Sequence, residues 1–458
     1  MMCRRLPAIA LLALAGCAVP TQQPDPALLQ RASAPFTAQG TATRMEPAPD
    51  WWRLYYAPEL DALVAASLAA NADLRVAFAN LDSARAALAG ARMSRLPQTT
   101  IESGLLVDHT STQPSASAIP STDWDIALTA SWDLDLFGRL RKAALAARAD
   151  SEAQRAALDG AKVAVAADTV QAYFDLCGAQ HALVQATEAA TAAERLVALV
   201  REQLVAGEVS ALELSQAATL AASNRAAITP FEAQSTNALF RLATLQGRTP
   251  AEGPVPVPTC TAPPRLSTPL PVGDGMALLL RRPDIREADR RLAAAAARVG
   301  VARADLYPRV SLGGAAGLIA RSFDTAVTPL LTWAFPNAAP ARSRLEQARA
   351  GERAALAGWD AAVLKALREV ETALSAYDVE MRRNHELLTA EAQAGQYARR
   401  AEARVRLGDA AGLVGVDAQR TLATTRLQRV QSDLAIGQIQ VALFRALGGG
   451  WNQGPDPR

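Results

Sequence analysis

Residues 123–138 read DWDIALTASWDLDLFG, and the fold follows from the change of pattern within them. From Trp124 to Leu136, apolar residues alternate strictly with polar or small ones, which predicts a strand with two unlike faces. After Gly138 the alternation stops, and residues 139–206 are rich in alanine and charge and contain no proline. This composition predicts one helix, roughly 100 Å long at about 1.5 Å per residue. No ordinary globular core buries such a helix, so the junction indicates a membrane barrel continued by a helical tube.

The strand is expected to turn its apolar face to lipid and its carboxylates, Asp125, Asp133 and Asp135, to a wetted interior. The residues expected on the lipid face are Trp124, Ile126, Leu128, Trp132 and Leu134. No apolar run reaches the roughly 18 residues that a transmembrane helix requires. A membrane crossing by this chain would therefore use strands.

The N-terminus carries a secretory signal, in which Arg4 and Arg5 precede an apolar run that is too short to span a bilayer. The run ends in LAGC at 14–17, which resembles a bacterial lipobox. On that resemblance, residues 1–16 are a signal peptide and Cys17 carries a covalent lipid such as palmitate. Ala18, in place of aspartate, favours the outer membrane by analogy with lipoprotein sorting. An ordinary signal peptide followed by an incidental cysteine is the alternative.

The rest of the chain nearly repeats itself. Pro97 and Pro308 lie 211 residues apart, whereas Trp132 and Trp333, like Gly207 and Gly408, lie 201 apart. The ten-residue change falls in the loop 110–122, where outer-membrane proteins take insertions. The predicted organisation is a lipidated tether (17–50), a first repeat (51–247), a proline-rich linker (248–275), a second repeat (276–450) and a tail (451–458).

Each repeat is predicted to follow one plan of helix, β-hairpin, long helix, glycine break and long helix. The first repeat would have its hairpin at about 98–137 and its long helices at 139–206 and 211–245. The second would have a helix at 284–306, a hairpin at about 309–337 and long helices at 341–407 and 413–447. In the last strand, built around Leu331, Trp333 and Phe335, Pro329 would suit a strand start or an edge.

Four strands from one chain cannot close a membrane barrel. The smallest bacterial barrels use about eight strands, because lipid leaves no partner for open edges. The long alanine-rich helices also carry more small apolar surface than one chain could bury. The sequence therefore predicts an oligomer.

Seven motifs stand out along the chain: LAGC (14–17), SWDLDLFG (131–138), QAYFDL (171–176), RPDIREA (282–288), ARADLYP (302–308), VDAQR (416–420) and ALGGGW (446–451). Together they resemble the motifs of TolC-like outer-membrane factors, in the lipoprotein branch that serves multidrug efflux pumps. The resemblance covers essentially the whole mature chain. It implies a mainly α fold with membrane β: a homotrimer that pools four strands per chain into one twelve-stranded barrel, continued by a periplasmic helical tunnel.

The resemblance also implies a function. The chain would be a passive exit duct for drugs and small toxic compounds, from periplasm to outside, in a tripartite pump. Its partners would be a periplasmic adaptor protein, an inner-membrane RND-type pump and outer-membrane lipid, with no cofactor apart from the lipid on Cys17. The alternatives are a type I protein-secretion duct and a periplasmic coiled-coil scaffolding lipoprotein.

The family closes its periplasmic end at the turns between long helices. Leu413 and Asp417 match its constricting leucine and aspartate, and three copies of Asp417 would form an acidic ring. A core leucine and a solvated aspartate are the plainer alternative. The first-repeat counterpart of Asp417 is Gln216. The family has further gating charges nearby, whereas here Val414 and Gly415 occupy neighbouring positions. The expected adaptor contacts are Gly207, Glu208, Gly408, Asp409 and Gly412.

Cysteines and charges bound the remaining possibilities. Once Cys3 leaves with the signal and Cys17 is lipidated, Cys177 and Cys260 remain, either as a disulfide that pins the linker to the long helix or as two free thiols. Lys+Arg 47 against Asp+Glu 45 gives no reason to expect a nucleic-acid partner. The three histidines lack metal-ligand spacing and no catalytic motif occurs, so an enzyme is not expected.

Overall fold

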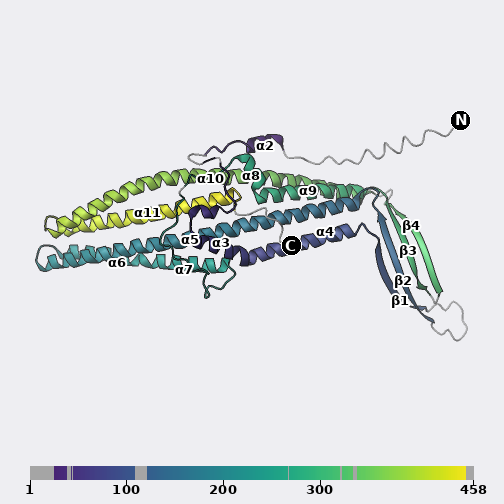
Figure 1. Cartoon of the computed structure of the whole chain (residues 1–458), viewed down its shortest axis with the longest axis horizontal. Coiled ribbons are helices and arrows are strands. Elements are labelled where there is room, and N and C mark those ends of the chain that lie inside the picture. The colour runs from purple at the N-terminus through teal and green to yellow at the C-terminus, as the bar shows by residue number, and fades with distance from the viewer. Residues whose placement is uncertain are drawn as a thin grey trace. The chain divides into compact units, whose positions relative to one another are not determined.

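The computed structural model describes residues 25–38, 43, 45–108, 121–266, 268–319, 322–333 and 338–449 (Figure 1). The signal peptide, Cys17 and the tail 451–458 lie outside the described residues. The chain forms two compact units. The sheet unit comprises Met1–Leu28, Ala79–Ala156 and Ile285–Ala362, and the helical unit comprises Leu29–Phe78, Ala157–Asp284 and Val363–Arg458. Neither unit coincides with a sequence repeat, because each takes segments from both.

The sheet unit contains four antiparallel strands in the order β1-β2-β3-β4. They are β1 (Gln98–Asp108), β2 (Ser121–Leu134), β3 (Arg309–Ile319) and β4 (Ser322–Thr332). The connections within the two hairpins are residues 109–120 and 320–321, which accounts for the ten-residue change in repeat offset. Within the described chain β1 and β4 each pair on one side only, so the sheet has two open edges.

The apolar face of β2 is its more exposed face. Ile126, Leu128 and Trp132 are 46%, 50% and 40% exposed, whereas Asp125 and Ala127 on the opposite face are only partly exposed. A sheet in a water-soluble protein buries its apolar face instead. This inverted pattern suits a sheet whose apolar side meets lipid.

The prediction for the last strand was wrong in its position. β4 ends at Thr332, so Trp333 follows the strand, and Phe335 lies outside the described residues. The indole Nε1 of Trp333 donates a hydrogen bond to the carbonyl of Leu306 (3.4 Å), as Trp132 does to Arg95 (3.0 Å). Pro329 lies inside β4 at the sheet edge, where a residue without an N–H is tolerated.

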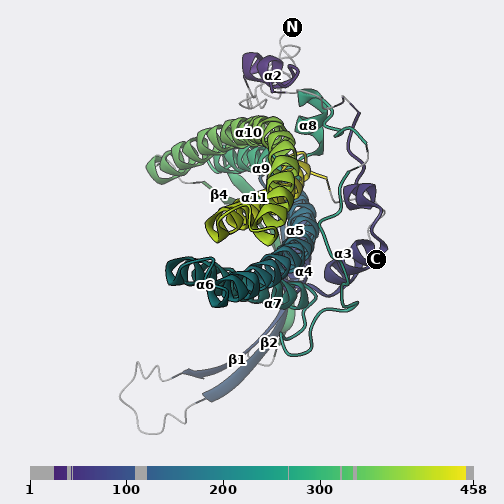
Figure 2. The ribbon, with the colours of Figure 1, turned by 90° about the vertical axis from the view of Figure 1, so that its left-hand side faces the viewer.

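The remaining elements are helices. They are α2 (Pro26–Ala32), η2 (Trp51–Tyr55), α3 (Pro58–Ala70), α4 (Ala72–Met93), α5 (Arg139–Val205), α6 (Ala211–Ala226), α7 (Ile228–Leu245), α8 (Gly275–Arg281), α9 (Pro283–Ala304), α10 (Ala339–Arg406) and α11 (Gly412–Ala446). In the described chain no single helix has the length and hydropathy of a membrane span, although α3 and α4 together pass that test as a bent pair. Figure 2 shows α6 beside α5 and α11 beside α10.

The helix expected at 211–245 is broken at Ala227. Pro230 explains the break, because it has no N–H to donate to the carbonyl four residues earlier and its ring crowds that carbonyl. Ala227, with φ −72° and ψ −12°, keeps the i→i−4 bond from its N–H to the carbonyl of Ser223 and also contacts the carbonyl of Arg225, so it closes the last turn of α6. The return path in the first repeat is therefore two helices, whereas α11 is continuous.

Aromatic side chains hold η2 against α5 and α11 within the helical unit. The ring of Trp51 stacks on Phe444 with centroids 4.5 Å apart, and Tyr55 meets Phe174 edge to face at 5.0 Å. A Cβ on Gly437 would lie 2.7 Å from the ring of Phe174, so the absence of a side chain there permits the close approach of α11 and α5.

The segment expected as a tether is partly folded. Within 17–50, α2 forms a helix, and the backbone N–H groups of Thr37 and Ala38 donate to the two carboxylate oxygens of Glu371 (2.7 and 2.9 Å). Thr43 pairs with the linker through the carbonyl of Leu270. These contacts correct the prediction of a free tether that extends to residue 50.

Candidate functional site

The turns between the long helices have one backbone design in both repeats. Gly207 and Gly408 adopt left-handed conformations, with φ of +78° and +73°. The residue after each glycine donates its N–H back into the preceding helix, which is the Schellman arrangement of a helix end. These bonds run from Glu208 N to Gln203 O and from Asp409 N to Arg404 O, each 2.9 Å. The 201-residue repeat is thus preserved in backbone geometry.

The side chains at the two turns differ. In the first, Ser210 and Glu213 form a capping box, with Ser210 N 2.8 Å from Glu213 Oε2. In the second, Arg404 binds Asp409 through both its carboxylate (2.9 Å) and its carbonyl (3.1 Å), while Ala411 offers no side-chain cap to α11. One turn is closed by a serine and the other by an arginine, so the two present different chemistry.

Four of the five residues expected to contact an adaptor are exposed: Gly207, Glu208, Gly408 and Asp409. Gly412 is buried in the first turn of α11, and a Cβ there would lie 3.0 Å from a methyl carbon of Val200. Gly412 therefore permits α11 to pack against α5, and its expected place on the contact surface is corrected.

The two expected gate residues, Leu413 and Asp417, lie in the first two turns of α11. Leu413 is 48% exposed, so it is not a core leucine within this chain. Asp417 binds two partners: Arg420 Nη2 lies 2.7 Å from its Oδ1, and the hydroxyl of Tyr397 on α10 donates to its Oδ2 (3.3 Å). Partial desolvation, together with the hydrogen bond and charge of Asp417, raises the pKa of Tyr397.

This geometry changes what the aspartate can do. Arg420 offsets much of the charge of Asp417, so a ring of three copies would be a ring of ion pairs and not of bare carboxylates. Tyr397 joins α10 to α11 through the same carboxylate. Asp417 therefore acts as a link between helices as well as a charge. Arg420 could have been identified from its i,i+3 spacing, whereas nothing in the sequence pointed to Tyr397.

The position that corresponds to Asp417 in the first repeat carries no charge. Gln216 is partly exposed, but its Oε1 is buried without a hydrogen-bond partner among the described residues. Gly415 packs closely: a Cβ there would lie 3.1 Å from Leu196 Cδ1. A side chain at that position would therefore crowd α5.

The expected lipid-facing residues all lie on β2, and their side chains differ in exposure. Ile126, Leu128 and Trp132 are exposed and Leu134 is partly exposed. Trp124 is paired with Leu105 in the sheet, and its side chain lies outside the described residues.

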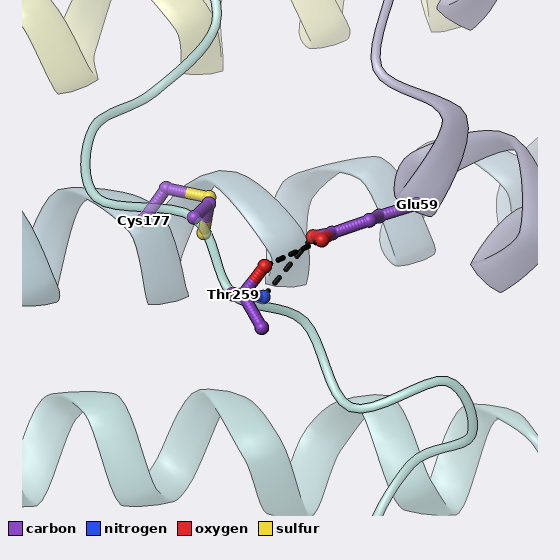
Figure 3. Close-up of a disulfide and its surroundings, with 4 residues drawn as sticks. Glu59, Cys177 and Thr259 are labelled. Carbon is purple, nitrogen blue, oxygen red and sulfur yellow. Dashed lines mark hydrogen bonds between the residues drawn. A yellow bond between two sulfur atoms is a disulfide. The ribbon is translucent and has the colours of Figure 1, made fainter.

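Cys177 and Cys260 are joined by a disulfide, with Cα atoms 5.3 Å apart (Figure 3). Beside the bond, the carboxylate of Glu59 accepts from the N–H (3.0 Å) and the hydroxyl of Thr259 (2.5 Å). These hydrogen bonds lower the pKa of Glu59. The linker is therefore held to α5 by a covalent bond and to α3 by a carboxylate.

The described residues include no group of three or more His, Cys, Asp or Glu side chains placed to hold a metal ion. The groups gathered at the turns are a leucine, an ion pair and a phenol. They can narrow a passage, attract or repel ions and join helices.

Known proteins with this sequence pattern and fold export compounds through the outer membrane. Residues 63–248 and 276–449 match the family described as "Outer membrane efflux protein". The chain is 30% identical to the solvent efflux pump outer membrane protein SrpC of Pseudomonas putida, over 98% of each chain. It is 31% identical to the pyoverdine export outer membrane protein OpmQ of the same species, over 96% of each chain.

Solved structures agree with this architecture. The outer-membrane channel OprN superposes with a TM-score of 0.87 at 34% identity, covering 95% of this chain and 99% of that one. CusC, at 24% identity, has the same fold with a TM-score of 0.82, covering 94% of this chain and 99% of that one.

Proposed function

The chain belongs to the outer membrane efflux protein family, and from this membership we propose that it is the exit duct of a tripartite pump, carrying drugs and small toxic compounds from the periplasm to the outside. The family consists of transport channels and not of enzymes. The observation that supports the proposal best is the open four-stranded sheet, in which the apolar face of β2 is the more exposed one. The same chain contains helices of 67 and 68 residues, which follow the two hairpins in sequence.

The open sheet supports a homotrimer. An unpaired strand edge in lipid costs several kcal/mol per unsatisfied backbone group, by the general cost of burying such groups. β1 and β4 each have one free edge, and joining β4 of one copy to β1 of the next leaves no edge once a ring closes. Three copies give twelve strands, which is within the range of known membrane barrels.

The turns support a gate and a docking site. In the proposed trimer, Leu413 supplies bulk at the periplasmic end, and the link from Tyr397 to Asp417 holds α10 and α11 in a closed arrangement. The exposed residues Gly207, Glu208, Gly408 and Asp409 would contact a periplasmic adaptor, which connects the duct to an inner-membrane RND-type pump. Cysteine cross-linking from Glu208 and Asp409 to the adaptor tests this contact.

The lipid on Cys17 would anchor the chain. The contacts of Thr37 and Ala38 with Glu371 attach the segment after the lipid to the helical unit, so the anchor and the helices are joined by a short connection. The lipid would then hold the chain at the membrane before the barrel forms.

A type I protein-secretion duct has the same architecture and remains the second candidate, while a periplasmic scaffolding lipoprotein leaves the outward apolar sheet without a role. A deletion strain decides between them. Loss of the gene should raise susceptibility to several small toxic compounds, and the wild-type chain should restore resistance. Unchanged susceptibility together with loss of a secreted protein would favour the secretion duct.

The assembly has its own test. Outer-membrane fractions should contain a trimer that resists sodium dodecyl sulfate and dissociates on heating, and a Cys17→Ala chain should show how far assembly depends on the lipid. A monomer without sheet content by circular dichroism would rule out the duct and favour the scaffold.

A further inference from the structure

The helical unit contains a cavity that the proposed gate and turns do not use. It has a volume of about 620 Å³ and lies between α5, α10 and α11, at the point where α11 ends and α9 begins. Sites for small organic molecules typically have volumes of about 300–1,000 Å³. The cavity is therefore large enough for a compound of the size that efflux pumps carry.

Positive charge predominates around the cavity. Four cationic side chains line it, against two carboxylates. The cations are Arg282, Lys365, Arg368 and Arg445, and the carboxylates are Asp284 and Glu369. The net charge of the lining is therefore positive by two.

Both carboxylates are already engaged by one arginine. Arg282 is buried and binds Asp284 through two nitrogens (2.9 and 2.7 Å) and Glu369 through Nη2 (2.8 Å). Its Nη1 donates to the carbonyl of Ala446 (2.6 Å). Burial alone would lower the pKa of Arg282, but these hydrogen bonds and charges raise it, so the side chain stays charged. Arg282 thus holds the wall of the cavity together and occupies both acids.

The other three cations remain available. Arg368 is exposed and has neither an ion-pair nor a hydrogen-bond partner among the described residues. Lys365 is 60% exposed, and its Nζ lies 3.9 Å from a carboxylate oxygen of Glu369. Arg445 is 53% exposed and forms an ion pair at 3.3 Å with Asp168, which lies outside the cavity lining. Each could turn toward a bound anion without breaking a buried contact.

The rest of the lining includes apolar side chains. Val163 and Ala164 of α5 and Ile439 and Ala442 of α11 belong to it and offer no hydrogen-bonding side chain. A ligand that suits both kinds of lining carries a negatively charged group and an apolar body.

We propose that this cavity binds exported organic anions, in which a carboxylate or sulfonate is attached to an apolar body. The anionic group contacts Arg368, Lys365 and Arg445, and the body lies against Val163 and Ile439. The proposal rests on the channel function and names a substrate class for it.

The test measures binding to the purified full-length protein by isothermal titration calorimetry, with three probes. Naphthalene-1-sulfonate carries both features, 1-naphthylmethylammonium reverses the charge, and inorganic sulfate lacks the apolar body. The sulfonate should bind about tenfold more tightly than the ammonium compound, the factor expected for one charge-assisted contact. It should also bind about tenfold more tightly than sulfate, because only the sulfonate buries an apolar body. Equal affinity for the sulfonate and the ammonium compound would overturn the proposal.

Variants locate the site. Arg368→Gln removes a cation without leaving a partner behind, and it should weaken sulfonate binding about tenfold, as should Arg445→Gln. Arg382→Gln is the matched control, because Arg382 lies on the same helix but outside the cavity, paired with Asp378. If Arg368→Gln and Arg445→Gln both bind like the control, the site lies elsewhere and the inference is wrong.

Current through the protein in planar bilayers separates the anion site from the channel function. Sulfonate should reduce the wild-type current and affect the Arg368→Gln current less. Binding without any effect on the current would overturn the assignment of this class as cargo. If the wild type and the Leu413→Ala and Asp417→Ala variants all conduct no current yet the wild type binds the sulfonate selectively, the channel function fails and the anion site stands.

Discussion

Arg282 follows Asn71 by 211 residues, the same offset as that between Pro97 and Pro308, and both side chains join the end of one helix to the start of another. Asn71 donates from Nδ2 to the carbonyl of Leu245 at the end of α7 (3.0 Å). Its Oδ1 accepts the N–H groups of the first turn of α4. Arg282 makes the equivalent junction between α11 and α9, through Ala446 and Asp284.

The two junctions should differ in strength. Arg282→Ala leaves Glu369 and the carbonyl of Ala446 without their shared partner, and should lower the free energy of unfolding by about 3 kcal/mol. Asn71→Ala removes a cap and one hydrogen bond, and should cost about 1–2 kcal/mol. Denaturation followed by circular dichroism measures both. Arg382→Ala, which breaks an exposed pair, should cost less than about 1 kcal/mol, and an equal loss in all three variants would contradict this ranking.

The gate prediction concerns Leu413 and Asp417. Leu413→Ala removes bulk, and Asp417→Ala removes the acceptor that joins α11 to Tyr397, so each should raise single-channel conductance in planar bilayers. A hydrogen bond worth about 1 kcal/mol corresponds to about a fivefold change in the open fraction. Tyr397→Phe should reproduce the part of the effect that is due to the link.

Gln216→Ala is the control for the gate, because Gln216 is the first-repeat counterpart of Asp417 and carries no charge. It should leave conductance near the wild-type value. Unchanged conductance and unchanged export in both Leu413→Ala and Asp417→Ala would remove these residues from the gate.

Alkaline pH should destabilise the helical unit. Burial and the charge of Glu59 raise the pKa of Tyr173 from 10.0 to about 12. Between these values the unfolded chain has lost the phenolic proton and the folded chain has kept it, so stability falls as pH rises through this range. Tyr55, whose pKa burial also raises, adds to the fall. Denaturation midpoints measured between pH 10 and 12 check the slope.

Tyr173→Phe should make that slope shallower, because it removes one of the tyrosines whose pKa is raised in the folded chain. Tyr56→Phe provides the comparison, since Tyr56 is 76% exposed. Identical slopes in the wild type and Tyr173→Phe would show that Tyr173 does not contribute.

The disulfide should contribute substantially to stability. Cys177 and Cys260 are 83 residues apart, and a chain-entropy treatment of such a loop gives about 4–5 kcal/mol. Reductant should lower the denaturation midpoint of the wild type and leave a Cys177→Ala, Cys260→Ala double variant unchanged. A midpoint insensitive to reductant in both proteins would show that the linker stays in place without the bond.

Much of the fold could be predicted because its patterns are long. The alternation on β2 and the proline-free run from Arg139 each extend over many residues, so each indicates its element without tertiary information. The repeat then extended this plan to β3, whose glycine-rich sequence is a weak strand signal by itself.

The parts of the fold that could not be predicted depend on a local helix break or on contacts between residues far apart in the sequence. Pro230 breaks a helix locally, within a stretch whose composition otherwise favours one continuous helix. The docking of Thr37 on Glu371 and the link from Tyr397 to Asp417 join residues from different helices or segments, and no periodicity encodes them. The buried position of Gly412 depends on Val200, which is likewise distant in sequence.

The shared backbone of the Gly207 and Gly408 turns has a consequence for symmetry. Each chain has two turns of one backbone shape, but Ser210 caps the helix after the first and Arg404 binds Asp409 in the second. In the proposed trimer, three chains would present six such turns around a ring, with Gly207 turns and Gly408 turns in alternation. A partner built from six identical subunits would therefore make two kinds of contact, and each of its subunits would have to tolerate both.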